Sequence, residues 1–251
     1  MTVENEFPYP KESFVALLKD YYTGINGPDR FDETKQWQSD IYTATVNCSR
    51  GYVLEKAGFS LVTISGGTIN GSPGNITLFE TLAYPQNPAI PGFIIMTNMN
   101  HSDDRGTMVV FFTDLIIQNK KPRSEDTKQF AAALTGVCEQ YGHSFEELNA
   151  TTAGQGVLGG NAGECGFLGF FEEKDTDFLE AVITTVLEIY KKILLDNKAN
   201  PDTTDFTSTY SSRARLIDWI ITQNYGIQVG RENGIPLEVI ESYGFPPVVR
   251  Y

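Results

Sequence analysis

Two apolar runs joined by a polar turn indicate the fold class: Phe93-Ile94-Ile95-Met96-Thr97-Asn98-Met99-Asn100 and Thr107-Met108-Val109-Val110-Phe111-Phe112-Thr113-Asp114-Leu115-Ile116. Each run is short and rich in β-branched and aromatic residues, which is typical of a β-strand. Residues 59–64 and 76–82 repeat this pattern upstream, and a period of two begins at Ile41. Because no helical pattern interrupts residues 40–116, we expect an antiparallel meander there.

Turns and helices are expected around this meander. Residues 48–51 are a predicted turn, 65–67 are predicted to end a strand, and 24–32 are a predicted loop. Helical spacing of apolar residues predicts helices at 11–23, 125–141 and 176–196, with a short one at 236–243. Residues 167–171 are a predicted strand, 199–209 a polar connector, and 215–221 either strand or helix. The sequence therefore predicts an α+β fold, with residues 1–251 as a single domain.

The charge balance is strongly acidic, with 32 acidic and 19 basic residues giving a net charge of −13. Basic residues cluster only at 120–123 and 213–215, so neither nucleic acid nor an anionic membrane surface is an expected partner. The N-terminal residues carry no apolar signal-peptide core. The three cysteines lack a Cys-x-x-Cys spacing, which suggests reduced thiols. We expect a cytoplasmic protein.

Metal-ligating and phosphate-binding patterns are weak in this chain. The two histidines, His101 and His143, are far apart and belong to no motif with metal-ligand spacing, so no metal site is expected. The glycine-rich residues 154–163 precede a predicted strand instead of a helix and lack the lysine of a phosphate loop. They are either a flexible loop or a glycine-lined wall against which a flat ligand could lie.

Asp114 is the most unusual residue of the decisive segment, because it interrupts an apolar strand. A carboxylate buried there must be paired, hydrogen bonded or used in chemistry. Strand alternation could equally place it on a solvated face. The pattern alone leaves both interpretations open.

Several segments resemble the oxygen-dependent coproporphyrinogen III oxidases. The most specific is Val53-Leu54-Glu55-Lys56-Ala57-Gly58-Phe59-Ser60, which is similar to the family's Phe-Glu-Lys-Ala/Gly-Gly-Val strand. Asn87-Pro88-Ala89-Ile90-Pro91 is similar to its Asn-Pro-x-x-Pro turn. Residues 213–219 resemble its Arg-Gly-Arg-Tyr-Val-Glu-Phe segment, and the order of the matching segments is kept from about residue 36 to 251.

This resemblance implies a broad antiparallel sheet flanked by helices on both faces, in a homodimer. It implies oxidative chemistry that uses O₂ without a metal or organic cofactor. By the same resemblance, Asp114 is the expected catalytic residue, and the expected substrate-binding residues are Ser60, Asn98, Arg213 and Arg215.

The chain departs from the family where that family has a His-x-Asn-x-Arg strand, because the same steps lead here to Ile94, Met96 and Asn98. Propionates need Arg or Lys partners, so a porphyrinogen with several of them is a poor match. Two functions stay open: an oxidoreductase acting on a tetrapyrrole or another flat aromatic substrate, and a non-catalytic protein that binds a tetrapyrrole or other small ligand. A third is a structural or partner-binding dimer.

Overall fold

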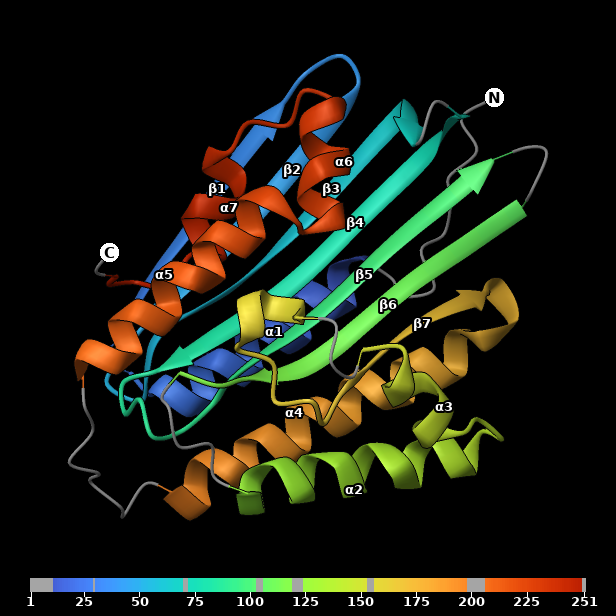
Figure 1. Ribbon diagram of the computed structural model, residues 1–251. Helices are drawn as coiled ribbons and strands as arrows, with labels where there is room; N and C mark the ends of the chain where they lie inside the picture. The colour runs from blue at the N-terminus through green and yellow to red at the C-terminus, as the bar shows by residue number, and fades with distance from the viewer. Residues whose placement is uncertain are drawn as a thin grey trace.

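The computed structural model describes residues 11–28, 30–69, 72–102, 106–118, 124–152, 156–197 and 206–249. The basic cluster 120–123 and most of the predicted polar connector, residues 199–205, lie outside these ranges. The described residues form a seven-stranded antiparallel sheet with helices on both of its faces (Figure 1). The predicted α+β class with an antiparallel sheet is therefore confirmed.

The strands lie across the sheet in chain order, so each pairs with its sequence neighbours. They are β1 Phe31–Gln38, β2 Tyr42–Arg50, β3 Leu54–Ile69, β4 Ser72–Pro85, β5 Gly92–Ser102, β6 Gly106–Ile116 and β7 Phe167–Glu172. Strands β1 to β6 follow one another closely along the chain, whereas helices separate β6 from β7. This is the antiparallel meander expected for residues 40–116, extended by one strand at each edge.

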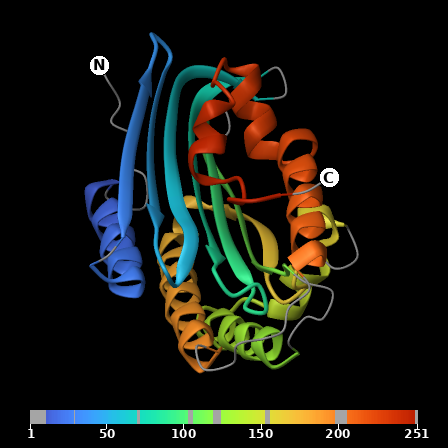
Figure 2. The same cartoon turned by 90° about the vertical axis from the view of Figure 1, so that its left-hand side faces the viewer.

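The helices divide between the two faces of the sheet. They are α1 Lys11–Asn26, α2 Ser124–Gln140, α3 Phe145–Ala150, α4 Thr176–Asn197, α5 Phe206–Thr222, α6 Tyr225–Glu232 and α7 Glu238–Tyr243. Helices α5 to α7 cover one face, and α1 and α4 cover the other (Figure 2). None of the helices in the described ranges is long and apolar enough to cross a membrane.

Two hydrophobic cores lie on opposite faces of the sheet because successive side chains of a strand point to opposite sides. On β4, Phe79 and Ala83 enter the core under α1, α2 and α4. Leu82 and Tyr84 of the same strand enter the core under α5 to α7. Since both faces are covered, most side chains of the central strands are buried, and a charged residue on them must be accommodated inside the protein.

Four expected helices match the structure in type and position. The helices predicted at 11–23, 125–141, 176–196 and 236–243 correspond to α1, α2, α4 and α7. Residues 215–221, for which strand and helix were both open, belong to α5. Residues 206–209, predicted as part of a connector, are the first turn of α5. The short helices α3 and α6 have no counterpart among the predictions.

The predicted loop at 24–32 is wrong at both ends. Helix α1 continues to Asn26, and the edge strand β1 begins at Phe31. The sequence of β1, FDETKQWQ, shows little apolar alternation because almost all of its side chains are exposed or half-buried. A strand that pairs on one edge only and packs little of its surface leaves a weak pattern in the sequence.

Two predicted turns are parts of strands. Cys48, Ser49 and Arg50 belong to β2, which pairs with β1 on one side and β3 on the other. Strand β3 runs through Gly66 and Gly67 to Ile69, with an irregular register between Ile64 and Gly67. Gly66 has a φ of +64°, which suits a β-bulge and strains other residues. The glycines therefore bend a long strand without ending it.

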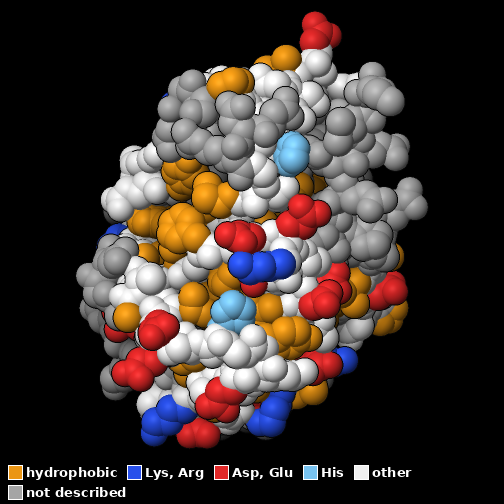
Figure 3. All heavy atoms as spheres, turned by 90° about the vertical axis from the view of Figure 1, so that its right-hand side faces the viewer, with side chains coloured by type: hydrophobic (Ala, Val, Ile, Leu, Met, Phe, Trp, Pro, Cys, Tyr) orange, Lys and Arg blue, Asp and Glu red, His pale blue; other side chains and the backbone are white. Residues whose placement is uncertain are grey.

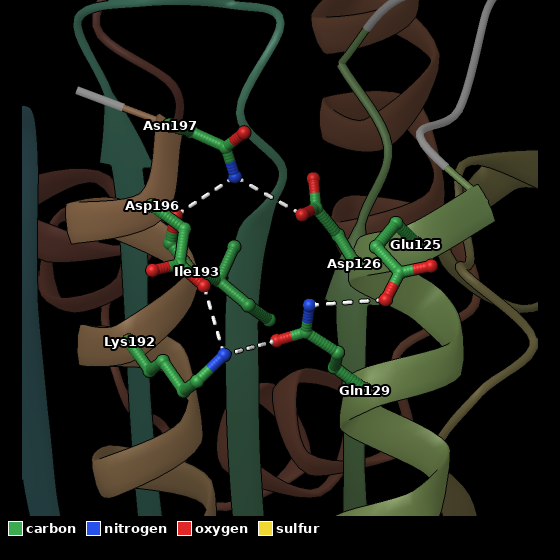
Figure 4. Close-up of polar contacts among 7 residues, drawn as sticks. All are labelled: Glu125, Asp126, Gln129, Lys192, Ile193, Asp196 and Asn197. Carbon is green, nitrogen blue, oxygen red and sulfur yellow. Dashed lines mark hydrogen bonds and ion pairs between the residues drawn. The ribbon is translucent and has the colours of Figure 1, made fainter. Parts of the chain in front are cut away.

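Helices α2 and α4 are held together by polar side chains (Figure 4). Asn197 donates one hydrogen bond to Asp126 Oδ1 at 3.0 Å and another to the Ile193 carbonyl at 2.8 Å. Lys192 binds Gln129 Oε1 and Asp196, each at 2.8 Å. Asp126 and Asn197 are buried, so these contacts fix the end of α4 against the start of α2.

The β7 edge of the molecule presents a mixed surface. Met108 on β6 and Phe170 on β7 are exposed, and their neighbour Glu172 carries a charge. Figure 3 faces this side and shows acidic side chains among apolar and neutral ones. The strongly acidic composition is thus visible on the surface as scattered carboxylates.

Candidate functional site

A pocket lies between the sheet and the C-terminal helices, over β3, β4 and β5 and under α6 and α7. It encloses about 480 Å³ of empty space, including its open mouth. Most of its lining is aliphatic or aromatic, which is typical of a site for a small, largely apolar ligand. Its polar side chains are Ser60, Glu80, Asn98, Asn224, Arg231 and Tyr243.

Strand alternation and register bring three of these polar residues onto one face of the sheet. Ser60 of β3 lies directly opposite Glu80 of β4. Glu80 lies opposite Met96 of β5, and Asn98 is two residues further along that strand, so it is on the same face. Glu80 and Asn98 are therefore diagonal neighbours across adjacent strands, within reach of one small ligand.

Glu80 is a buried carboxyl group on the sheet face of the pocket. Its Oε2 accepts a hydrogen bond from the Tyr243 hydroxyl at 2.6 Å, and its Oε1 accepts a long one from Asn224 at 3.5 Å. Burial raises the pKa of Glu80 to about 7, although both hydrogen bonds act in the opposite direction. The carboxyl group can therefore gain or lose a proton near neutral pH.

Tyr243 lies close to both Glu80 and Ser60. Its pKa lies well above the usual range for a tyrosine, because of burial and because the neighbouring Glu80 disfavours a second negative charge. The nearby Ser60 side chain acts on this pKa in the opposite direction. The hydroxyl of Tyr243 thus stays protonated and donates to Glu80, and Ser60 lines the same pocket.

Asn98 contributes an amide without a partner. The residue is 6% exposed, and its Nδ2 has no hydrogen-bond acceptor among the described residues. Its side chain lies against Gly226 in the first turn of α6, where a Cβ would stand 3.3 Å from the amide. A buried donor of this kind costs free energy unless something accepts its hydrogen bond, so a ligand or water in the pocket is its natural partner.

Among the described residues that line the pocket, one is a cation, and it lies at the rim. Arg231 of α6 lines the pocket and is exposed, so its guanidinium group belongs to the mouth. No ion pair to Glu80 is present in the described part of the chain. The site therefore combines an uncompensated carboxyl group inside with a solvated positive charge at the entrance.

Asp114 does not line this pocket. It is 1% exposed, and its carboxylate accepts hydrogen bonds from the backbone N–H groups of Leu115, Glu164 and Cys165, at 2.7, 3.1 and 3.3 Å. The Cys165 thiol is a further donor, at 3.2 Å from Oδ1. Burial raises the pKa of Asp114 to about 6 against the effect of these bonds. Of the two interpretations of Asp114, the buried and hydrogen-bonded carboxyl group is the one observed. Its hydrogen bonds fix the segment that leads into β7.

The two predicted arginines also lie away from the pocket lining. Arg213 is buried, with Nη2 at 2.9 Å from Glu55 and Nε donating to Gln118 at 2.8 Å. Arg215 donates to Asn161 at 3.3 Å and to Ser212 at 2.9 Å. The structure thus brings only Ser60 and Asn98 of the predicted site residues together. A substrate role for the two arginines stays a prediction.

The described part of the glycine-rich stretch packs against α5. Gly159 has a φ of +63°, and a Cβ on it would stand 2.7 Å from the Arg215 carbonyl oxygen. Residues 153–155 lie outside the described ranges. At Gly159 the absence of a side chain allows this close approach between two parts of the backbone, whereas a Cβ on Gly156 or Gly160 would meet nothing within 4 Å.

The cysteines and histidines form no metal centre in the described ranges. Cys48, Cys138 and Cys165 are buried free thiols. The His101 ring is hydrogen bonded to the Thr107 hydroxyl across the β5–β6 hairpin, at 3.0 Å. No group of three or more His, Cys, Asp or Glu side chains among the described residues has the geometry of metal ligands.

Neither the models of known protein families nor the curated proteins contain a match for this chain. Four polar residues of the pocket lining were not predicted from the sequence: Glu80, Asn224, Arg231 and Tyr243. Glu80 interrupts the apolar strand 76–82 in the same way that Asp114 interrupts β6, and this signal could have identified it.

Proposed function

We propose that this chain binds a flat, largely apolar small molecule, such as a tetrapyrrole or another aromatic heterocycle, in the pocket under α6 and α7. The observation that carries this proposal is an apolar pocket in which Asn98 Nδ2 has no acceptor among the described residues, beside Glu80 oxygens that each accept one hydrogen bond and can accept another. The fold we propose is the coproporphyrinogen-oxidase-like one, and an antiparallel sheet between two layers of helices supports it. The homodimer implied by the same resemblance stays a prediction.

A second candidate function is cofactor-free oxidation of such a molecule by O₂. The raised pKa of Glu80, about 7, supports it, because a carboxylate of that basicity can take a proton from a pyrrolic or similar carbon acid. In that reaction the substrate loses two protons and two electrons in total, and O₂ takes up both to become H₂O₂. The binding function needs fewer assumptions and is the one we put first.

The test uses purified full-length protein with a porphyrin, a bilin and, in air, coproporphyrinogen III. We expect saturable spectral changes with at least one of the flat ligands. Gly230 of α6 lines the pocket, so Gly230→Leu should fill it and weaken binding about tenfold or more. Gly136→Leu is the matched control, since Gly136 is an α2 residue with nothing within 4 Å of its Cβ position.

Two results would overturn the proposal. One is the absence of binding for every flat ligand by folded wild-type protein. The other is equal binding by the two leucine variants, because the ligand would then lie elsewhere. Product or H₂O₂ formed from coproporphyrinogen III in air, and absent without O₂, would favour the second candidate over simple binding.

A further inference from the structure

Inside the pocket, Asn98 and Glu80 provide a hydrogen-bond donor and an acceptor at neighbouring positions. Asn98 Nδ2 is a buried donor that lacks an acceptor in the described residues. Glu80 accepts from Tyr243 and distantly from Asn224, so its two oxygens retain capacity for another donor. The two side chains are diagonal neighbours on β4 and β5. A ligand edge that satisfies both must present an N–H and a carbonyl side by side.

We propose that the pocket selects a flat ligand with a lactam edge, whose N–H donates to Glu80 while its C=O accepts from Asn98. This inference rests on the proposed function, and it adds the chemical class of the ligand. An aromatic ring without the edge leaves Asn98 unpaired, and a carboxylate at the same place meets Glu80 as a second acceptor. Sites built for hydrogen bonding reject analogues that lack the matching group most strongly.

The surroundings of the two side chains favour a neutral ligand edge. Tyr243 already donates its only proton to Glu80, so it cannot supply a second donor to the ligand. Arg231 is at the exposed mouth and can pair with an anionic substituent only on the far side of the ligand. The aliphatic lining, including Leu78, Val62 and Ile227, fits the two faces of a ring system.

A set of two-ring probes tests this selection. 2-Quinolinone carries the lactam edge, 1-methyl-2-quinolinone lacks its N–H, naphthalene has neither polar group, and quinoline-2-carboxylate is an anion. We expect 2-quinolinone to bind about tenfold tighter than its N-methyl analogue, and the carboxylate to bind weakest. Equal affinities for the first two, with measurable binding, would overturn the lactam assignment and leave the proposed function intact. Binding of none of the probes, together with no porphyrin or bilin binding, would overturn both.

Variants assign the two contacts to their residues. Glu80→Gln should reduce the preference for 2-quinolinone over its N-methyl analogue to about threefold or less, because this preference reports the N–H contact. Asn98→Leu should instead weaken the binding of both quinolinones relative to naphthalene by about tenfold, because both carry the carbonyl. Thr97→Val is the matched control on the same strand, because Thr97 is buried, faces away from the pocket and has no hydrogen-bond partner for its hydroxyl. If Asn98→Leu leaves the affinities of both quinolinones relative to naphthalene unchanged, the assignment of the carbonyl contact is wrong. The wild-type probe series decides the question should either site variant fail to fold.

The pH dependence of the preference for 2-quinolinone distinguishes a ligand contact of Glu80 from a purely structural role, because a structural role would not change this preference. Its pKa of about 7 means that the carboxylate, the stronger acceptor, is lost as the pH falls from 8 to 6. The titratable groups around it are Tyr243 of α7, Tyr84 further along β4 and Arg231 at the mouth; both tyrosine pKa values are raised above the usual range. The preference for 2-quinolinone should therefore fall several-fold over that interval, and be constant in Glu80→Gln. A flat profile in the wild type would contradict the contact.

Discussion

Asp114 and Glu80 show how a carboxyl group can have different roles at two positions on the same face of one sheet. Both are buried carboxyl groups on apolar strands, and burial raises both pKa values. Asp114 is surrounded by donors of its own chain, whereas Glu80 receives one short and one long hydrogen bond and lines a pocket. The supply of donors, more than burial, distinguishes a carboxylate that fixes a loop from one that is available to a ligand.

Replacing Asp114 by Asn tests its structural role. The amide NH₂ would face a backbone N–H that now donates to the carboxylate, so we expect a loss of about 1–3 kcal/mol in the free energy of unfolding. Urea unfolding at pH 7 measures it. Ligand affinity should change little in the folded variant, because Asp114 does not line the pocket.

The pH dependence of the same variant has a defined sign. The folded pKa of Asp114, about 6, lies above its ordinary value of 3.8, so the wild type loses stability as the pH rises between these values. The Asn variant lacks this contribution, and the stability difference between the two proteins should shrink from pH 4 to pH 6. Unchanged stability combined with lost ligand binding would instead support the catalytic role expected from the sequence.

Among the elements, α5 is the helix whose attachment affects the pocket most, because α6 and α7 follow it directly. A single buried side chain, Arg213, links α5 to Glu55 of β3 and to Gln118 after β6. Its guanidinium group also lies over the Tyr84 ring, 6.0 Å from the ring centroid. Arg213 thus adds a fully engaged cation to the apolar packing of Leu216 and Ile220 that holds α5 on the sheet.

Arg213→Ala should lower the free energy of unfolding by about 3 kcal/mol, because it leaves Glu55 and Gln118 without their partner. Arg215→Ala is the matched control on the same helix, and its exposed position predicts a loss of about 0.5 kcal/mol or less. Thermal and urea unfolding compare the two variants. Equal stability of both would contradict the anchoring role of Arg213.

The same elements show what the sequence could predict. Strands buried on both faces, such as β4 to β6, and long amphipathic helices such as α4 leave clear patterns. Strand β1 and helices α3 and α6 were missed because an exposed edge strand and helices of six to eight residues carry little periodic signal. Ser60 and Asn98 were expected at the site. Whether Asp114 or Glu80 faces the pocket depends on which segment of the chain covers each residue, and strand alternation does not encode that covering segment.

At the scale of the whole molecule, the net charge of −13 acts on every approaching ion. Few of its carboxylates are buried, so the negative potential extends into the solvent and weakens with ionic strength. Anionic ligands approach against this potential, and Arg231 is the one positive charge that the described pocket lining offers them. The global charge and the interior of the pocket thus favour the same neutral or cationic ligands.

Tryptophan quenching measures this potential without any ligand. Trp37 and Trp219 are both half-buried and accessible to small quenchers. At about 10 mM ionic strength we expect iodide to quench less efficiently than at about 100 mM, and caesium to show the opposite trend. Neutral acrylamide is the control, and its efficiency should not change. A salt-independent iodide constant would show that the acidic surface does not act at these positions.

The meander order of the sheet has a consequence for how the molecule is made. Each of the strands β2 to β6 pairs with the strand synthesised just before it, so the sheet can zip together hairpin by hairpin as the chain leaves the ribosome. Helices α5 to α7 follow last. The floor of the pocket on β3 to β5 is therefore synthesised well before α6 and α7, and the pocket is complete only after these last helices have docked.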